Sequence, residues 1–131
     1  MTERQRIASG SPYEPVIGFS RAIRVRDRVV VSGTGPIWPD GTVDPDPEAQ
    51  AARCLAIILE ALEAAGATAA DVVRTRMYLV HASDWEAVGR AHGAVFGDVR
   101  PAATMIVVAG LLDERWHVEI EAEAVIGATP G

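Results

Sequence analysis

The stretch RPAATMIVVAGLLDERWHVEIEAEA, residues 100–124, carries the pattern that decides the fold. After Pro101, a run of small, β-branched and apolar residues predicts a strand over residues 103–109. A short polar connection leads to a second strand, residues 116–126, in which glutamate recurs at every other position. Because successive side chains of a strand point to opposite faces, this strand has one carboxylate face and one apolar face. The apolar face is expected to pack on the core, and the carboxylate face is a candidate wall of a site.

Toward the N-terminus, the spacing of apolar residues indicates a helix followed by another strand. Asp46 and Pro47 combine an N-cap acid with a proline in the first turn, and Gly66 suits the position after a helix end. The apolar positions at helical spacing are Ala51, Leu55, Ile58 and Leu62. Residues 71–81 then alternate as a strand.

A second helix is predicted between that strand and residue 100. The segment SDWE, residues 83–86, has the pattern of a capping box, and Gly97 is placed to end the helix. Trp85, Val88 and His92 fall on one side at helical spacing and are expected to face inward. His92 is interpreted as a packing residue.

The N-terminal third reads as three strands. A short first strand precedes a loop rich in glycine and proline, and Arg26 and Asp27 form a tight turn between the next two strands. The complete order is β-β-β-α-β-α-β-β, an α+β pattern with helices on one face of a sheet. The uncovered face predicts an oligomer, since an exposed apolar sheet face is usually buried against a partner.

Length and composition predict one soluble domain over residues 1–131. The formal net charge of −6 disfavours nucleic acid as a partner, because phosphate binding needs a basic surface. Cys54 is the only cysteine, which fits a reducing compartment. The N-terminus has no apolar signal-peptide core, and no apolar run reaches the roughly 20 residues that span a membrane. A cytoplasmic protein without membrane contact is expected.

The carboxylate face consists of Glu119, Glu121 and Glu123, and two interpretations apply to it. In the first, the face is solvated and partly neutralised by Arg74 and Arg76 on a neighbouring strand, which we favour for Glu121 and Glu123. In the second, a buried glutamate with a raised pKa serves as a general base that positions water. Periodicity alone leaves open which glutamate is buried.

Other reactive residue types have no supporting pattern. His81, His92 and His117 lie on different elements and lack metal-ligand spacing, so no metal site is predicted. Cys54 lies among apolar helix residues and is expected to be a buried, inert thiol. No serine has a nucleophile-elbow context, and no glycine-rich loop has the phosphate-binding pattern.

Four segments taken together resemble the Rid family, also called the YjgF family: RVVVSGTGPI, AARCLAIILEALEAAGATAADVVRTRMYLV, RPAATMIVVAGL and VEIEAEAV. The resemblance runs from about residue 7 to residue 126. It implies a chorismate-mutase-like fold, with a six-stranded mixed sheet and two helices on one face. It also implies a homotrimer whose sheets form a central barrel, with small-molecule clefts between subunits.

The same resemblance implies hydrolysis of reactive enamines and imines, such as 2-aminoacrylate, to a 2-keto acid and ammonia without metal or cofactor. Some family members are described as ribonucleases, to which the acidic charge here gives no support. By position, the implied cleft includes Phe19, where deaminating members usually have tyrosine, and the backbone of Gly33. The turn from Arg100 to Thr104 forms one wall, and Glu119 holds the attacking water.

The segment PAAT, residues 101–104, departs from the deaminating pattern, because Ala103 stands where the resemblance places a carboxylate-binding arginine. Losing such a charge-assisted pair costs about 2–5 kcal/mol. The site is therefore expected to favour a neutral or cationic ligand and to act weakly on 2-aminoacrylate. Arg21, Arg100 and Arg115 are the alternatives that could supply the cation.

Two functions follow, and a third remains open. The first is a hydrolase acting on an imine, an enamine or a related small metabolite, with Glu119 positioning water. The alternative is a binding protein that holds a small metabolite between subunits without turnover. A purely structural trimer is the third. The retained Glu119 and cleft-forming loops favour the hydrolase.

Overall fold

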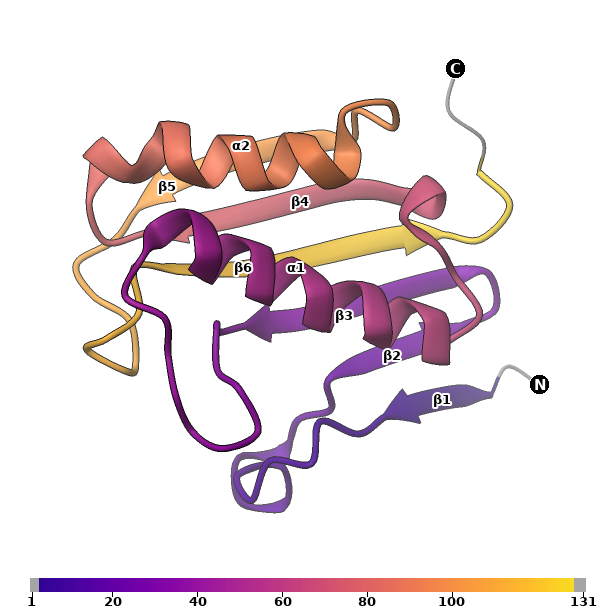
Figure 1. The fold of residues 1–131 in the computed structure, drawn as a ribbon. Coiled ribbons are helices and arrows are strands. Elements are labelled where there is room, and N and C mark those ends of the chain that lie inside the picture. The colour runs from indigo at the N-terminus through magenta and orange to yellow at the C-terminus, as the bar shows by residue number, and fades with distance from the viewer. Residues whose placement is uncertain (1–2, 129–131) are drawn as a thin grey trace.

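A computed structural model describes residues 3–128 and shows the expected order of elements (Figure 1). The strands are β1 (Arg4–Ile7), β2 (Ala22–Val25), β3 (Arg28–Thr34), β4 (Val72–Leu79), β5 (Ala102–Val107) and β6 (Val118–Val125). The two long helices are α1 (Pro47–Ala64) and α2 (Trp85–Phe96). Three short helical segments, η1 (Glu14–Gly18), η2 (Ala69–Asp71) and η3 (Ala82–Asp84), lie in the connections.

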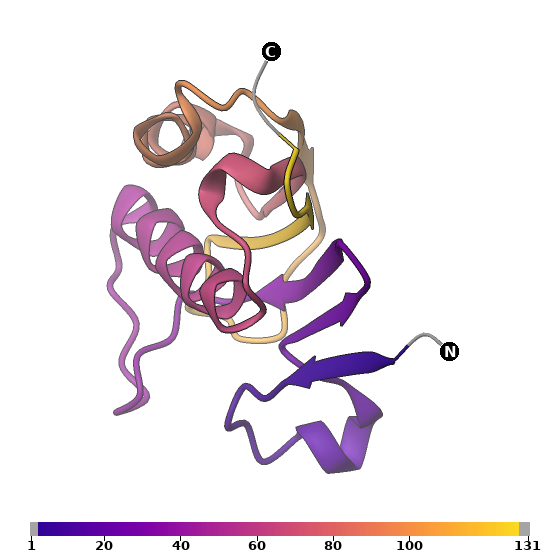
Figure 2. The ribbon, with the colours of Figure 1, turned by 90° about the vertical axis from the view of Figure 1, so that its right-hand side faces the viewer.

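All six strands form one mixed sheet in the order β1-β2-β3-β6-β4-β5. Only β4 and β5 are parallel, which requires the crossover that α2 provides. The other neighbouring pairs are antiparallel. Both long helices lie on the same side of the sheet (Figure 2), so the predicted six-stranded mixed sheet with two helices on one face is confirmed.

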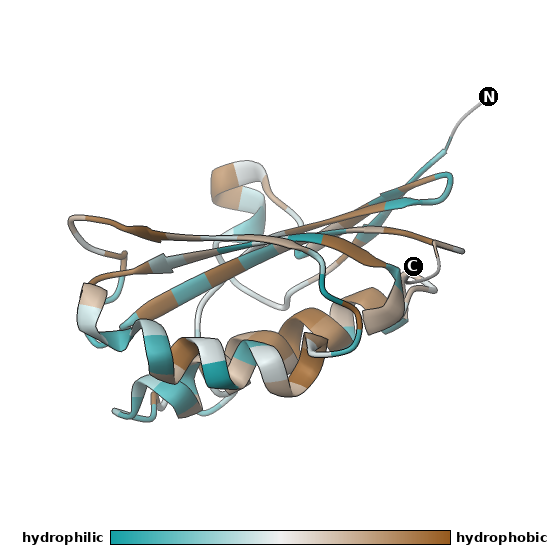
Figure 3. Cartoon of the chain, turned by 90° about the horizontal axis from the view of Figure 1, so that it is seen from above, coloured by the Kyte–Doolittle hydropathy of each residue, from teal (hydrophilic) through white to brown (hydrophobic). Residues whose placement is uncertain are grey.

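The core fills the space between α1, α2 and the sheet, and the alternation along β6 accounts for it. Val118, Ile120, Ala122 and Ala124 are all buried toward the helices. Hydrophilic and hydrophobic bands alternate along the strands, with the helices beneath (Figure 3). The glutamates between these apolar positions therefore lie on the face that the helices leave uncovered.

Helix α1 begins and ends where the sequence predicts. The Asp46 carboxylate accepts a hydrogen bond of 2.9 Å from the Ala49 amide, and Gly66 has a φ of +89° just beyond the last turn. The four residues predicted to face the core are fully buried, namely Ala51, Leu55, Ile58 and Leu62. Cys54 is also buried, and desolvation raises the pKa of its thiol well above the ordinary value.

The start of α2 differs from the prediction. The capping box over residues 83–86 is wrong: η3 runs directly into α2, and the Asp84 side chain makes no cap hydrogen bond. Trp85 is 58% exposed rather than inward. Val88 is buried as expected. A hydrogen bond of 2.8 Å joins His92 Nε2 to the hydroxyl of the buried Thr75.

The connections also refine the prediction. Arg26 and Asp27 form the expected two-residue turn between β2 and β3, with Arg26 at a φ of 57°. The segment after β1 contains the single helical turn η1, where the sequence predicts a loop. Strand β5 begins one residue earlier and ends two residues earlier than predicted. Strand β6 begins two residues later and ends one residue earlier than predicted.

Candidate functional site

Two of the three glutamates on the uncovered face have partners. Tyr78 on β4 donates its hydroxyl proton to Glu121, and this hydrogen bond raises the pKa of Tyr78. Arg76 lies 3.5 Å from both Glu121 and Glu123, and Arg28 on β3 lies 3.1 Å from Glu123. These two carboxylates therefore belong to a cross-strand network of opposite charges, as the first interpretation predicts. Arg76 takes part as expected, but among the described residues the second arginine is Arg28 and not Arg74.

Glu119 differs from its neighbours on β6. Within residues 3–128 it forms neither a hydrogen bond nor an ion pair, and its side chain is half-buried. Burial raises the pKa of Glu119 above the ordinary value of a glutamate carboxyl, the nearby charge of Arg21 opposes that rise, and Glu121 adds to it. A half-buried carboxylate with a raised pKa and a free hydrogen-bonding capacity has the character of a general base.

An irregularity in β3 shapes the space beside Glu119. The register passes from Val31 opposite Ala122 to Thr34 opposite Ile120, so two residues of β3 face one residue of β6. This is a β-bulge, a feature that redirects strand groups and is common beside functional sites. The carboxylate of Glu119 lies directly over Gly33, where a Cβ would fall 3.3 Å from its Cδ atom and closer still to Oε2. A side chain at this position would therefore displace the Glu119 carboxylate.

Arg21 is the cation nearest to this space. Its amide donates to the Ile7 carbonyl at 2.8 Å and its carbonyl accepts from the Ser32 amide at 2.9 Å, which continues the ladder beyond β2. Its Nη1 donates to the Gly33 carbonyl at 3.0 Å and to Thr34 Oγ1 at 2.8 Å. Burial lowers the pKa of the guanidinium, while the charges of nearby acids oppose that change. Arginine remains charged under such shifts.

Arg100 does not approach Glu119 within one chain. The residue has a φ of 54°, and its Nε donates to the Gly97 carbonyl at 3.2 Å, so the side chain turns back to the end of α2. Arg100 and Pro101 line a shallow hollow beside β4 whose lining does not include Glu119. The predicted ligand-binding role of Arg100 has no support from this placement.

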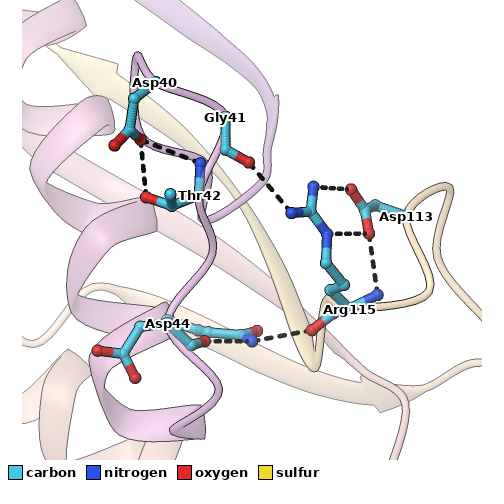
Figure 4. A network of polar contacts seen from close by, with 7 residues as sticks. Asp40, Gly41, Thr42, Asp44, Asp113 and Arg115 are labelled. Carbon is cyan, nitrogen blue, oxygen red and sulfur yellow. Dashed lines mark hydrogen bonds and ion pairs between the residues drawn. The ribbon is translucent and has the colours of Figure 1, made fainter.

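Arg115 is also engaged elsewhere (Figure 4). Its guanidinium donates to both carboxylate oxygens of Asp113, at 3.0 and 2.7 Å, and to the Gly41 carbonyl at 3.1 Å. The side-chain amide of Gln50 joins the carbonyls of Asp44 and Arg115, at 2.8 and 2.9 Å. This network fastens the loop before α1 to the loop before β6, so Arg115 has a structural role.

The remaining predicted residues lie on other elements than Glu119. In the parallel register Ala103 pairs with the buried Thr75 and so lies on the helix side, whereas Thr104 pairs with Arg76 on the carboxylate side. Within one chain, neither is a neighbour of Glu119, because β4 separates β5 from β6. Phe19 follows η1, with its amide bonded to the Glu14 carbonyl at 3.2 Å. It lies two residues before Arg21.

The structure thus joins Glu119 and Gly33 with Arg21, which the sequence suggested only as a substitute cation. Thr34 and Tyr78 were not expected at the site. The alternation of residues within β3 and β4 predicts on which face of the sheet Thr34 and Tyr78 lie. Their position next to Glu119 depends on the strand order and on the bulge in β3, which the sequence does not predict. Over residues 3–128 no group of three potential metal ligands is present, and no helix is long and apolar enough to cross a membrane.

Comparison with known proteins gives consistent matches over nearly the whole chain. A family model described as endoribonuclease L-PSP matches residues 10–126. An uncharacterized protein of Streptomyces coelicolor is 42% identical over 95% of this chain and 93% of its own. A 2-iminobutanoate/2-iminopropanoate deaminase of Capra hircus is 32% identical over 94% and 91%. A crystal structure of a Mycobacterium tuberculosis member of the YjgF/YER057c/UK114 family has a TM-score of 0.87 at 42% identity, over 95% of this chain and 100% of that chain.

Proposed function

Since the chain belongs to the endoribonuclease L-PSP family, which includes the YjgF proteins, we propose that it is a hydrolase of small imines or enamines. The observation that carries this proposal is the environment of Glu119. It alone among the three glutamates on its face lacks a partner within the described residues, and its pKa is raised by burial. A relative 32% identical to this chain is named for deamination of 2-imino acids, which supports the same reaction class.

The reaction requires a base that carries two protons from water to the imine nitrogen, one in each half of the reaction. In the first half, Glu119 accepts a proton from water as the water oxygen bonds to the imine carbon, and it gives that proton to nitrogen, which leaves a tetrahedral carbinolamine. In the second half, Glu119 accepts the hydroxyl proton of the carbinolamine as the carbonyl forms and gives it to the departing nitrogen, so the C–N bond breaks and ammonia leaves. One imine and one water thus yield one carbonyl compound and one ammonia. An enamine enters the same path after protonation at carbon gives the imine.

The proposed site is completed by a homotrimer. Strand β5 is exposed along its whole length, including Met105, Ile106 and Val107, and its outer edge has no partner among the described strands. An exposed apolar edge strand of this kind is normally covered by another chain. In the proposed trimer the clefts lie between subunits. Ala103 and Thr104 of the edge strand would then border the ligand from a neighbouring copy, while Phe19 lies near Arg21 of the same chain.

Glu119→Gln tests the proposal. The 2-imino acids formed in situ by an amino-acid oxidase, and aldimines formed by an amine oxidase, provide a panel of imines with and without carboxylates. Release of ammonia is measured against the spontaneous rate. We expect the variant to lose about 100-fold or more in kcat/KM on any imine that the wild type hydrolyses.

Glu123→Gln is the matched control, because Glu123 lies on the same face of β6 but is neutralised by Arg28 and Arg76. It should keep wild-type activity. Equal losses in both variants would show that the charge of the face, rather than Glu119 itself, matters. A wild type that accelerates no imine in the panel would refute the hydrolase.

The alternative is a binding protein that holds a small metabolite in the same clefts. Ala103 favours it, because alanine cannot grip a substrate carboxylate as a guanidinium does. The two functions differ in the fate of the ligand. A metabolite that copurifies in stoichiometric amounts and is recovered chemically unchanged after long incubation identifies the binding protein.

A further inference from the structure

We infer that Arg21 forms an anion-binding subsite beside Glu119, and that the ligand of this site is a small carboxylate whose acidic group lies over β2 and β3. This inference rests on the proposed site at Glu119 and deepens it. It assigns the cation that Ala103 fails to provide to Arg21, the residue that immediately precedes β2. The ligand carboxylate is then held from the side of Glu119 opposite to β5.

The guanidinium of Arg21 is anchored by one nitrogen. Nη1 donates to the Gly33 carbonyl and to Thr34 Oγ1, and the Thr34 hydroxyl donates its own proton to the Ser32 carbonyl at 2.8 Å. The lone pairs of Thr34 Oγ1 therefore remain available to Arg21. Thr34 is only 1% exposed, so its position is set by the core. The orientation of the guanidinium is fixed before any ligand arrives.

The opposite edge of the guanidinium remains available. Within residues 3–128, Nε and Nη2 of Arg21 have no hydrogen-bond partner, and neither is among the buried polar atoms that lack one. These two nitrogens form the planar fork that binds both oxygens of a carboxylate. An anchored guanidinium with a free fork is a preorganised anion site, since little further side-chain entropy is lost on binding.

Neither nearby carboxylate of the chain occupies that fork. Glu14 accepts hydrogen bonds from both the amide and the hydroxyl of Ser9. Glu119 and Arg21 both contact Gly33, yet no ion pair joins them within the described part of the chain. Neither acid therefore competes with a ligand for the fork. In the inferred complex, a molecule with a carboxylate next to its reactive carbon contacts Arg21 and the water of Glu119 together.

Binding of 2-oxobutanoate, measured by isothermal titration calorimetry, tests the inference without requiring turnover. This keto acid carries the carboxylate and carbonyl of a hydrolysed 2-imino acid. We expect the wild type to bind it and Arg21→Gln to bind about 30-fold more weakly or not at all. Arg21→Lys should give an intermediate affinity, because it keeps the charge but loses the planar fork. Butanone, which lacks the carboxylate, should not distinguish these proteins.

Thr34→Val gives a second measurement that keeps the charge of Arg21. It removes the acceptor at Oγ1 while filling nearly the same volume, and it should weaken 2-oxobutanoate binding several-fold. Arg90→Gln is the control for lost positive charge, since Arg90 lies on α2 and pairs with Glu48 on the far side of the sheet. It should leave the affinity unchanged.

The inference fails if the wild type does not bind 2-oxobutanoate, or if Arg21→Gln binds it as tightly as the wild type. Loss of binding in Arg100→Gln with Arg21→Gln unaffected would assign the cation to the end of α2 instead. The proposed hydrolase is tested separately by ammonia release. A protein that binds 2-oxobutanoate through Arg21 but hydrolyses no imine supports the anion subsite and overturns only the hydrolase.

Discussion

Gly33→Ala separates the shape of the site from the stability of the fold. The added Cβ would lie within 3.0 Å of Glu119 Oε2, whereas ordinary contact begins at 3.4 Å. The carboxylate must therefore retreat by about 1 Å, and a displacement of that size costs on the order of 100-fold in rate when it moves a catalytic group.

The stability of Gly33→Ala should change little. The clashing atom is the end of a flexible side chain, and Gly33 does not have a positive φ, so alanine adds no backbone strain. Replacing glycine where the backbone permits it stabilises the native state by about 0.4–1 kcal/mol through the unfolded chain. The expected result is a protein with an unchanged or raised Tm and a kcat/KM lowered about 100-fold.

The assay is kcat/KM on an imine that the wild type hydrolyses, with Tm measured on the same preparations. Gly93→Ala is the matched control: a Cβ at Gly93 on α2 meets no atom within 4 Å, so activity should stay constant while Tm rises. Full activity in folded Gly33→Ala would refute the assignment of Glu119 as the base. A large fall in Tm would show that Gly33 serves the fold instead of the site.

Three further predictions concern the pH dependence of activity, the pH dependence of stability, and helix capping. Glu119 must be ionised to act and its pKa is raised, so kcat/KM should fall toward acid pH at a pH above the ordinary pKa of a glutamate carboxyl. Arg21 lowers this pKa, so Arg21→Gln should move the acid limb to higher pH. An acid limb at or below the ordinary glutamate pKa contradicts the first statement, and a limb that Arg21→Gln leaves in place contradicts the second. Because its pKa is raised in the folded protein, ionisation of Glu119 destabilises the fold as the pH rises through the folded-state pKa. At pH values above that pKa, Glu119→Gln should therefore be more stable than the wild type, which thermal melts at several pH values would show. Asp46→Ala removes the hydrogen bond to the Ala49 amide and should lower the free energy of unfolding by about 1 kcal/mol in urea titrations, whereas Asp46→Asn should retain most of it.

Much of the fold is predictable because it depends on local chemistry. The helix cap at Asp46, the glycine after α1 and the turn at Arg26 each follow from residues close together in the chain. The prediction failed at residues 83–86, where the same residue types that make a capping box instead form a short turn that continues into α2. Ser83 and Glu86 are residue types that can form a capping box, but the path of the backbone decides whether they do.

The candidate site was predictable only in part. Alternation along residues 116–126 places all three glutamates on one face, but it treats them as equivalent. Tyr78, Arg76 and Arg28 distinguish them by satisfying Glu121 and Glu123 and leaving Glu119 without a partner among the described residues. These partners come from strands distant in sequence, so their identity depends on strand order and register.

The amino-acid sequence by itself determined the order of the elements, the two faces of each strand and the presence of alanine at position 103. Only the tertiary structure decided that Arg21 and Glu119, nearly a hundred positions apart, border the same glycine. The physical reason is that a period of two residues specifies the face on which a side chain lies but not its neighbours across the sheet. Those neighbours follow from the pairing of β3 with β6 and from the bulge that turns the Gly33 carbonyl toward Arg21.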